Sequence, residues 1–85
     1  MNVNTLALFH KALSEPSRLK ILKDLLDNGE RCVCAFNTVI KKDASVVSRH
    51  IKLLEQANIV KTRKEGTCVY CTLNNKNQIK QILEG

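Results

Sequence analysis

Four cysteines are the side chains of this 85-residue sequence best suited to bind soft metals or to change oxidation state. Cys32 and Cys34 are separated by a single residue, whereas Cys68 and Cys71 lie closer to the C-terminus. The sequence has no apolar run long enough to span a bilayer and no signal-peptide pattern, so we predict a cytoplasmic protein without a membrane partner. In a reducing compartment such cysteines act as thiols, metal ligands or redox sensors more often than as structural disulfides.

A second set of chemically active side chains recurs at helical spacing in the middle of the chain. At positions i, i+3, i+4 and i+7 stand Ser45, Ser48, Arg49 and Lys52. Such residues share one face of a helix, and they can bond phosphates or the edges of bases. We therefore predict that they bind DNA. His50 is either a phosphate ligand beside them or a surface or half-buried helix residue.

The charge of the sequence supports a nucleic-acid partner. Its formal net charge is +6, from 14 basic and 8 acidic residues, and residues 41–64 alone carry +5. Concentrated positive charge is typical of polyanion binders, although a solvated basic face without a partner is the alternative. Aromatic residues make up only 4% of the chain, which argues against base-stacking platforms for single strands. Double-stranded DNA is therefore the expected partner.

Five helices and one hairpin account for the pattern of the sequence. The predicted helices cover about residues 5–13, 16–28, 32–41, 44–57 and 76–83, and the hairpin pairs about 59–63 with 67–73. Pro16 and Asp43 are typical of helix starts, Gly29 of a helix end and Gly66 of a hairpin turn. We predict a single domain over residues 1–85, mainly α with a two-stranded β wing, in a winged helix-turn-helix fold.

The predicted helix over residues 44–57 is placed to read a duplex. Its core seam consists of Val47, Ile51 and Leu54, which leaves the polar face free. In a helix-turn-helix the second helix enters the major groove. The hairpin adds three cations that we predict to contact phosphates or the minor groove, namely Lys61, Arg63 and Lys64.

Five blocks of the sequence together resemble the ArsR/SmtB family of metal- and metalloid-responsive transcriptional repressors. They are Ala12-Leu13-Ser14-Glu15-Pro16-Ser17-Arg18-Leu19, Gly29-Glu30-Arg31-Cys32-Val33-Cys34, Val47-Ser48-Arg49-His50-Ile51-Lys52-Leu53-Leu54, Ala57-Asn58-Ile59-Val60 and Arg63-Lys64-Glu65-Gly66. The resemblance implies a homodimer that binds palindromic operator DNA without a cofactor and is released when an inducer binds. It implies a dimer surface from the first and last helices, with Leu6, Leu8, Phe9, Ile79, Ile82 and Leu83.

The same resemblance implies a role for the first two cysteines. Cys32-Val33-Cys34 is similar to the Cys-Val-Cys element at the start of the third helix of arsenic, cadmium and lead sensors, which implies that Cys32 and Cys34 bind As(III), Cd(II) or Pb(II). Soft thiolates suit these soft ions. Residues two apart on an ideal helix point roughly 200° apart, so both sulfurs reach one ion only if the helix start is unwound.

The sequence also departs from the sensors that it resembles. Asn37 stands where the arsenic-sensing pattern has a third Cys, the first four residues contain no Cys, and the last helix has no His or Asp for a zinc site. Cys68, which we expect to be exposed on a strand, is a possible third donor. Cys71 shares the opposite face with Val69 and Leu73 and is expected to be a buried core residue.

Three interpretations of the function remain open at this point. The cysteines bind a metal or metalloid inducer, or they respond through a disulfide or persulfide, or they are inert in a winged helix used only for protein association. An enzyme is not expected, because the sequence shows no paired carboxylates, phosphate-cradling glycine loop or nucleophile–base arrangement.

Overall fold

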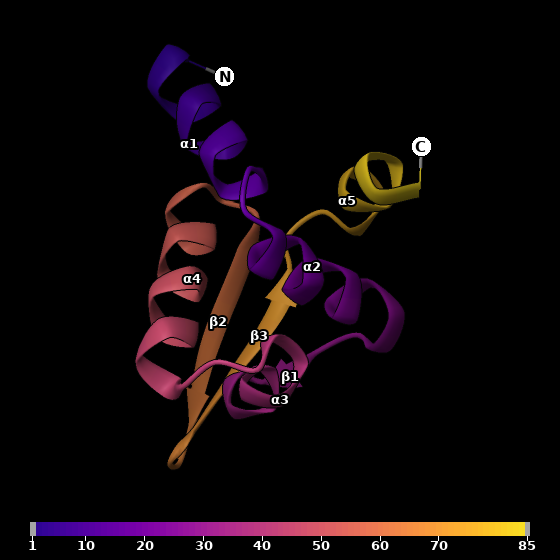
Figure 1. Cartoon of the computed structure of the whole chain (residues 1–85). Helices are drawn as coiled ribbons and strands as arrows, with labels where there is room; N and C mark the ends of the chain where they lie inside the picture. Colours follow the sequence, from indigo (N-terminus) through magenta and orange to yellow (C-terminus); the bar gives the residue numbers. More distant parts are fainter. Residues whose placement is uncertain (1, 85) are drawn as a thin grey trace.

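The computed structural model describes residues 2–84 and has the element order of a winged helix-turn-helix (Figure 1). Its elements are α1 (Val3–Leu13), α2 (Pro16–Asn28), β1 (Arg31–Cys32), the 3₁₀ turn η1 (Val33–Ala35), α3 (Phe36–Ile40), α4 (Ala44–Gln56), β2 (Val60–Glu65), β3 (Cys68–Leu73) and α5 (Lys76–Glu84). The predicted mainly α fold with a β wing is confirmed. None of the helices within residues 2–84 has the length and apolar character needed to cross a membrane.

Helix ends lie where the sequence signals predicted them. Pro16 is the first residue of α2, and Gly29 ends that helix with a φ of 77°, donating its backbone N–H to the Leu25 carbonyl at 2.8 Å. A positive φ is a conformation that glycine adopts without steric cost. Asp43 caps α4, because its carboxylate accepts the backbone N–H of Val46 at 3.1 Å. These residues fix both ends of α2 and the start of α4.

The prediction of a helix over residues 32–41 is wrong in its first half. Cys32 belongs to the short strand β1, η1 follows it, and the α-helix begins only at Phe36. Cys32 has an extended backbone, with φ of −64° and ψ of 136°. The apolar residues of this segment fit a helical period, but the edge of the wing offers its backbone a pairing partner instead.

That pairing adds a third strand to the predicted two-stranded wing. The sheet is antiparallel with the strand order β1-β3-β2, and β1 pairs Arg31 with Cys71 and Cys32 with Tyr70. The pairing satisfies backbone groups of β1 and covers one edge of β3. As a result, the segment that carries the first two cysteines lies against the strand that carries the other two.

The β2–β3 hairpin is confirmed, with its strands slightly shifted along the chain. Its register runs from Val60 opposite Leu73 to Glu65 opposite Cys68. The two-residue turn starts at Gly66, whose φ of 62° is the sign that a type II′ hairpin turn requires at this position. The wing therefore projects as a tight ribbon beside α4 (Figure 1).

One hydrophobic core lies between the helices and the sheet. Its largest fully buried side chains are Phe36, Ile21, Leu22, Leu25, Leu54, Ile59, Ile79, Val47, Val60 and Cys71. The predicted α4 seam is confirmed, because Val47, Ile51 and Leu54 are all buried. Placing Ile79 on a dimer surface is wrong, because this side chain is only 1% exposed and packs in the core of its own subunit.

Candidate DNA interface and thiol pocket

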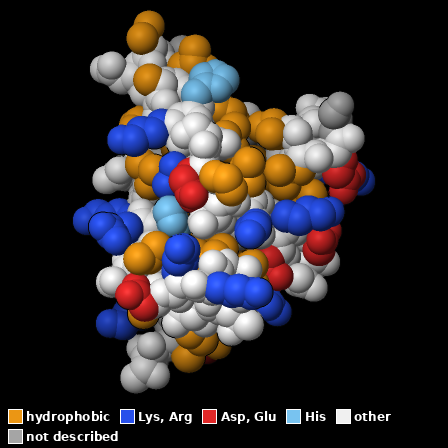
Figure 2. Space-filling model, in the orientation of Figure 1, with side chains coloured by type: hydrophobic (Ala, Val, Ile, Leu, Met, Phe, Trp, Pro, Cys, Tyr) orange, Lys and Arg blue, Asp and Glu red, His pale blue; other side chains and the backbone are white. Residues whose placement is uncertain are grey.

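The outer face of α4 presents the polar side chains that the sequence pattern placed together. Ser45, Ser48, Arg49 and Lys52 are all exposed, and the buried seam lies on the opposite side of the helix. Figure 2 shows Lys and Arg side chains on the left of the view, where α4 lies, and others across its centre and right. Ser45 donates its hydroxyl hydrogen to the Asp43 carboxylate at 2.8 Å, so this hydroxyl contributes to the helix cap and keeps only its lone pairs free.

His50 lies at the inner edge of this face and has partners within the protein. Its Nδ1 is 3.0 Å from Nη1 of Arg18, and its Nε2 is 3.8 Å from the Glu15 carboxylate. Because a guanidinium only donates, Nδ1 accepts and the ring hydrogen is on Nε2. Burial and the charge of Arg18 lower the pKa of His50. The geometry favours the half-buried interpretation of His50 over a phosphate contact through Nδ1.

Arg18 is a structural residue that sequence reasoning missed. It is only 9% exposed, and its Nε and Nη2 donate to the carbonyls of Ala12 and Lys11 at 2.9 and 3.1 Å. These bonds reach carbonyls in the last turn of α1, where a helix leaves its final carbonyls without an internal partner. The Lys11 carbonyl also accepts from Ser14. One side chain of α2 thus connects α1 to His50 of α4. Its position one turn before Ile21 and Leu22, on the apolar stripe, was the available signal.

The three wing cations differ in their surroundings. Lys61 and Lys64 are exposed. The Arg63 guanidinium donates two hydrogen bonds to the Glu30 carboxylate, at 3.1 and 2.8 Å, and a third to Glu65, and it lies 4.6 Å from the centre of the Tyr70 ring. The same pairing lowers the pKa of Glu30. Arg63 is thus neutralised by its neighbours, and its predicted DNA contact requires these bonds to open.

The first two cysteines lie in contact. The sulfurs of Cys32 and Cys34 are 2.9 Å apart, because the chain around them is a strand followed by a 3₁₀ turn rather than an α-helix. The unwinding that a shared ligand requires is therefore already present in this segment. The hydrogen bond from the Cys34 thiol lowers the pKa of Cys32, and the same interaction raises the pKa of Cys34. Cys32 is thus the better thiolate of the pair.

A pocket of about 330 Å³ joins these thiols to the helix-turn-helix. It is lined by Cys32, Val33, Cys34, Asn37, Ala44, Ser48, Thr67, Cys68 and Val69. Three of the four cysteines line this one space, and so do two residues from the first turns of α4. Within residues 2–84, no group of three His, Cys, Asp or Glu side chains is arranged to hold a metal ion.

Cys71 stands apart from this pocket. Its side chain is fully buried in the core, as predicted, and burial raises the pKa of its thiol to about 12. A thiol in this state is neither a good nucleophile nor a good metal ligand. Cys71 is the fourth cysteine, but it has no part in the site.

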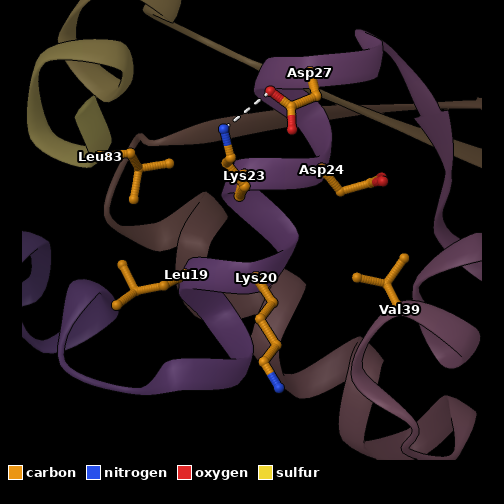
Figure 3. A pocket seen from close by; sticks show the side chains of 7 residues that line it. All are labelled: Leu19, Lys20, Lys23, Asp24, Asp27, Val39 and Leu83. Atoms are coloured by element: carbon orange, nitrogen blue, oxygen red, sulfur yellow. Dashed lines mark hydrogen bonds and ion pairs between the residues drawn. The ribbon is translucent and has the colours of Figure 1, made fainter.

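A separate hollow of about 470 Å³ lies between α2, α3 and α5 (Figure 3). Leu19, Val39 and Leu83 give it apolar walls, and the ion pair of Lys23 and Asp27, at 3.2 Å, lies at its edge. It contains no thiol and lies on neither the α4 face nor the wing. We assign it no part in DNA binding or in ligand binding.

Comparison with known proteins identifies the family to which this geometry belongs. Residues 15–62, which include the whole helix-turn-helix, match the model of the arsR family of bacterial regulatory proteins. The chain belongs to the ArsR family. ArsR-family members are DNA-binding transcriptional regulators with a winged helix-turn-helix and not enzymes, in agreement with the sequence-based prediction.

Curated relatives of this ArsR-family chain include metal-resistance regulators. An uncharacterized HTH-type transcriptional regulator of Methanocaldococcus jannaschii is 40% identical over 87% of the chain and 82% of its own length. A cadmium resistance regulatory protein CadC homolog of Staphylococcus aureus is 40% identical over 87% of the chain. That match covers 60% of the length of the relative. The arsenical resistance operon repressor of Bacillus subtilis is 35% identical over 78% of the chain and 63% of its length.

A solved structure shows the same arrangement. The homodimeric winged helix-turn-helix DNA-binding domain of a possible ArsR-family regulator from Mycobacterium bovis, determined by NMR, superposes with a TM-score of 0.81 at 30% identity. The match covers 96% of this chain and 75% of that one. The fold of this ArsR-family chain is thus similar to that of a solved winged helix-turn-helix DNA-binding domain.

Proposed function

We propose that this chain is a homodimeric transcriptional repressor that binds double-stranded operator DNA and is released when a thiol-binding metalloid or heavy metal binds Cys32 and Cys34. The observation that carries the proposal is the pair of sulfurs 2.9 Å apart in a pocket shared with Ala44 and Ser48 of α4. A ligand that binds this pair acts next to the helix that enters the major groove.

DNA binding is assigned to the outer face of α4 and to the wing. Arg49 and Lys52 are exposed, and neither forms an ion pair with any other residue in the range 2–84. Arginine can contact phosphate as well as read guanine, and lysine can contact phosphate. Ser45 and Ser48 add short polar groups that let the helix approach the groove, and Lys61 and Lys64 extend the basic surface along the wing.

A dimer is supported by apolar side chains left uncovered on the first and last helices. Val3 and Leu6 on α1 are 81% and 46% exposed, and Ile82 on α5 is 42% exposed. Figure 2 shows hydrophobic surface around α1 and between α1 and α5. Together with the homodimer of the Mycobacterium bovis relative, this exposure supports a dimer surface built from α1 and α5.

The class of inducer follows from the donor atoms. Thiolates prefer soft ions such as As(III), Cd(II) and Pb(II) to hard ones. Two relatives are named for resistance to cadmium and to arsenicals, which supports the same class. Binding displaces the thiol protons of Cys32 and Cys34, and the ion then takes up space in the pocket that Ala44 and Ser48 of α4 also line.

Operator release tests this assignment. A duplex selected by the protein from a random-sequence pool is titrated with wild type and with Cys32→Ser, and arsenite or Cd(II) is then added. We expect both proteins to bind the duplex equally and only the wild type to be released. Cys71→Ala is the matched control and should behave like the wild type. Release of Cys32→Ser at the wild-type ligand concentration would overturn the proposal.

A redox response of the same pair is the second candidate. The objection that helical cysteines two apart cannot reach each other does not apply, because the two sulfurs already touch. Hydrogen peroxide would oxidise both thiols to a disulfide, with loss of two hydrogens from the protein and reduction of the hydrogen peroxide to two waters. A mass decrease of two hydrogens that accompanies operator release, in buffer free of metals, would favour this candidate over metal binding.

A further inference from the structure

We propose that Cys68 of the same subunit is the third sulfur donor, so that Cys32, Cys34 and Cys68 close around one trivalent metalloid ion of the As(III) class. The inference deepens the proposed function and rests on its assignment of Cys32 and Cys34. It adds a donor from the wing, a site contained within one chain, and a preference for ligands that bind three thiols.

The register of the sheet places Cys68 on the correct face. Cys32 lies directly opposite Tyr70, and Cys68 stands two residues before Tyr70 on β3. Residues that face each other across an antiparallel pair, and residues two apart on one strand, point to the same side of the sheet. Cys32 and Cys68 are therefore diagonal neighbours on one face, while Cys71 points to the other.

Diagonal neighbours are close enough for long side chains to meet. Their separation is about 7–8 Å between Cα atoms and less between side chains, so a rotation of one thiol can bring the two sulfurs together. The lining of the pocket agrees, because all three thiols border one space. Hydrogen bonding from Cys68 also helps to lower the pKa of Cys32, which places the two groups within mutual influence.

The chemistry of trivalent arsenic matches three donors on one wall. Arsenous acid, As(OH)₃, reacts with three thiols to form three As–S bonds, and each thiol proton leaves with one hydroxide as water. Arsenic keeps its oxidation state and its lone pair, so the three sulfurs bind from one side. Here they come from β1, η1 and β3, while Asn37 and the first turns of α4 complete the pocket.

The position of Cys68 gives this site a mechanical link to both DNA-binding elements. Cys68 is the first residue of β3, directly after the wing turn, and Thr67 lines the same pocket. Drawing its sulfur toward Cys34 pulls the tip of the wing toward η1. Ala44 and Ser48 border the space that closes. One binding event thus changes the position of the wing relative to α4.

Two arsenic reagents separate two donors from three. Phenylarsine oxide forms only two As–S bonds, with release of one water, whereas arsenite forms three. We expect Cys68→Ser to bind phenylarsine oxide one to one, like the wild type. The same variant should bind arsenite at least about tenfold more weakly, because loss of even an outer partner of a metal ligand lowers metal affinity roughly 10–100-fold. Cys32→Ser should also lose tight arsenite binding, whereas Cys71→Ala should bind both reagents like the wild type.

A second variant tests whether the lost donor is a thiol in this pocket. Asn37 lines it, so Asn37→Cys in the Cys68→Ser protein should restore arsenite binding.

Mixed dimers of Cys68→Ser with Cys32→Ser subunits should bind no arsenite tightly, because neither chain has all three thiols. Tight binding by the mixture would overturn the single-chain site. Unchanged arsenite affinity of Cys68→Ser would overturn the role of Cys68 but leave the proposed function intact, whereas wild type that binds arsenite without releasing DNA refutes the proposed function alone.

Discussion

Replacing a single cation should change the salt dependence of DNA binding by an amount that depends on whether that cation already forms an ion pair within the protein. Arg49 is exposed and has no carboxylate partner within residues 2–84. The Arg63 guanidinium, in contrast, donates hydrogen bonds to the carboxylates of Glu30 and Glu65. A cation that neutralises a phosphate releases counterions, and one that is already neutralised releases few. Arg49→Ala and Arg63→Ala should therefore differ, although both remove one positive charge.

The size of the difference follows from counting charges in a dimer. Each lost phosphate contact reduces the slope of log K against log salt by about 0.9, so Arg49→Ala in both subunits reduces it by about 1.8. Over a fourfold rise in salt, from about 50 to 200 mM, wild-type affinity then falls roughly twelvefold more than that of the variant. Arg63→Ala should leave the slope close to that of the wild type.

Fluorescence anisotropy of a labelled duplex, at several salt concentrations, measures these slopes. Lys80→Ala is the matched control, because Lys80 is an exposed cation of α5 outside the α4 face and the wing. Glu30→Gln combined with Glu65→Gln should free Arg63 and make the slope steeper. Equal slopes for Arg49→Ala and Arg63→Ala would refute the distinction between free and paired cations.

Three further predictions concern stability, and urea unfolding followed by circular dichroism checks each of them. Arg18→Ala should lower the free energy of unfolding by about 3 kcal/mol or more, because three hydrogen bonds from a buried guanidinium are lost; a loss as small as that of Lys20→Ala would contradict this. Because the pKa of His50 is lowered in the folded protein, the unfolded chain binds a proton at this residue at a higher pH than the folded chain does. The contribution of His50 to the free energy of unfolding is therefore fully present above about pH 6.5 and declines below it. His50→Gln should reduce this decline, and a pH profile identical to that of the wild type would disprove the cause. Asp43→Ala should cost about 1 kcal/mol through loss of the α4 cap, while Asp43→Asn should cost less.

Local signals in the sequence predicted most of the fold. The period of Val47, Ile51 and Leu54 fixed both the buried seam and the exposed face of α4, and the caps at Gly29 and Asp43 were recognisable from residue type alone. Strand β1 was missed because its partner β3 follows much later in the chain. Arg31 and Cys32 have no strand signal of their own in the sequence, and only the pairing with β3 makes them a strand.

The same limit applies to the candidate site. That Arg63 is neutralised depends on Glu30, which is 33 residues away, and the role of Arg18 depends on His50, which is 32 residues away. Neither pair leaves a pattern in the sequence. The Cys32–Cys34 pair was visible from its spacing, but the arrangement that brings both sulfurs and Cys68 to one pocket depends on the sheet register.

The burial of Cys71 gives the protein an internal reporter of its own opening. Cys34 is exposed and open to an alkylating reagent in the folded chain, whereas Cys71 is sealed in the core. The rate at which Cys71 becomes alkylated therefore measures how often the whole domain unfolds. An inducer bound in the pocket, or a duplex bound on the DNA-binding surface, should slow the alkylation of Cys71 as the bound fraction rises. Ligand affinity then becomes measurable in a cell extract without a label on the ligand or on the DNA.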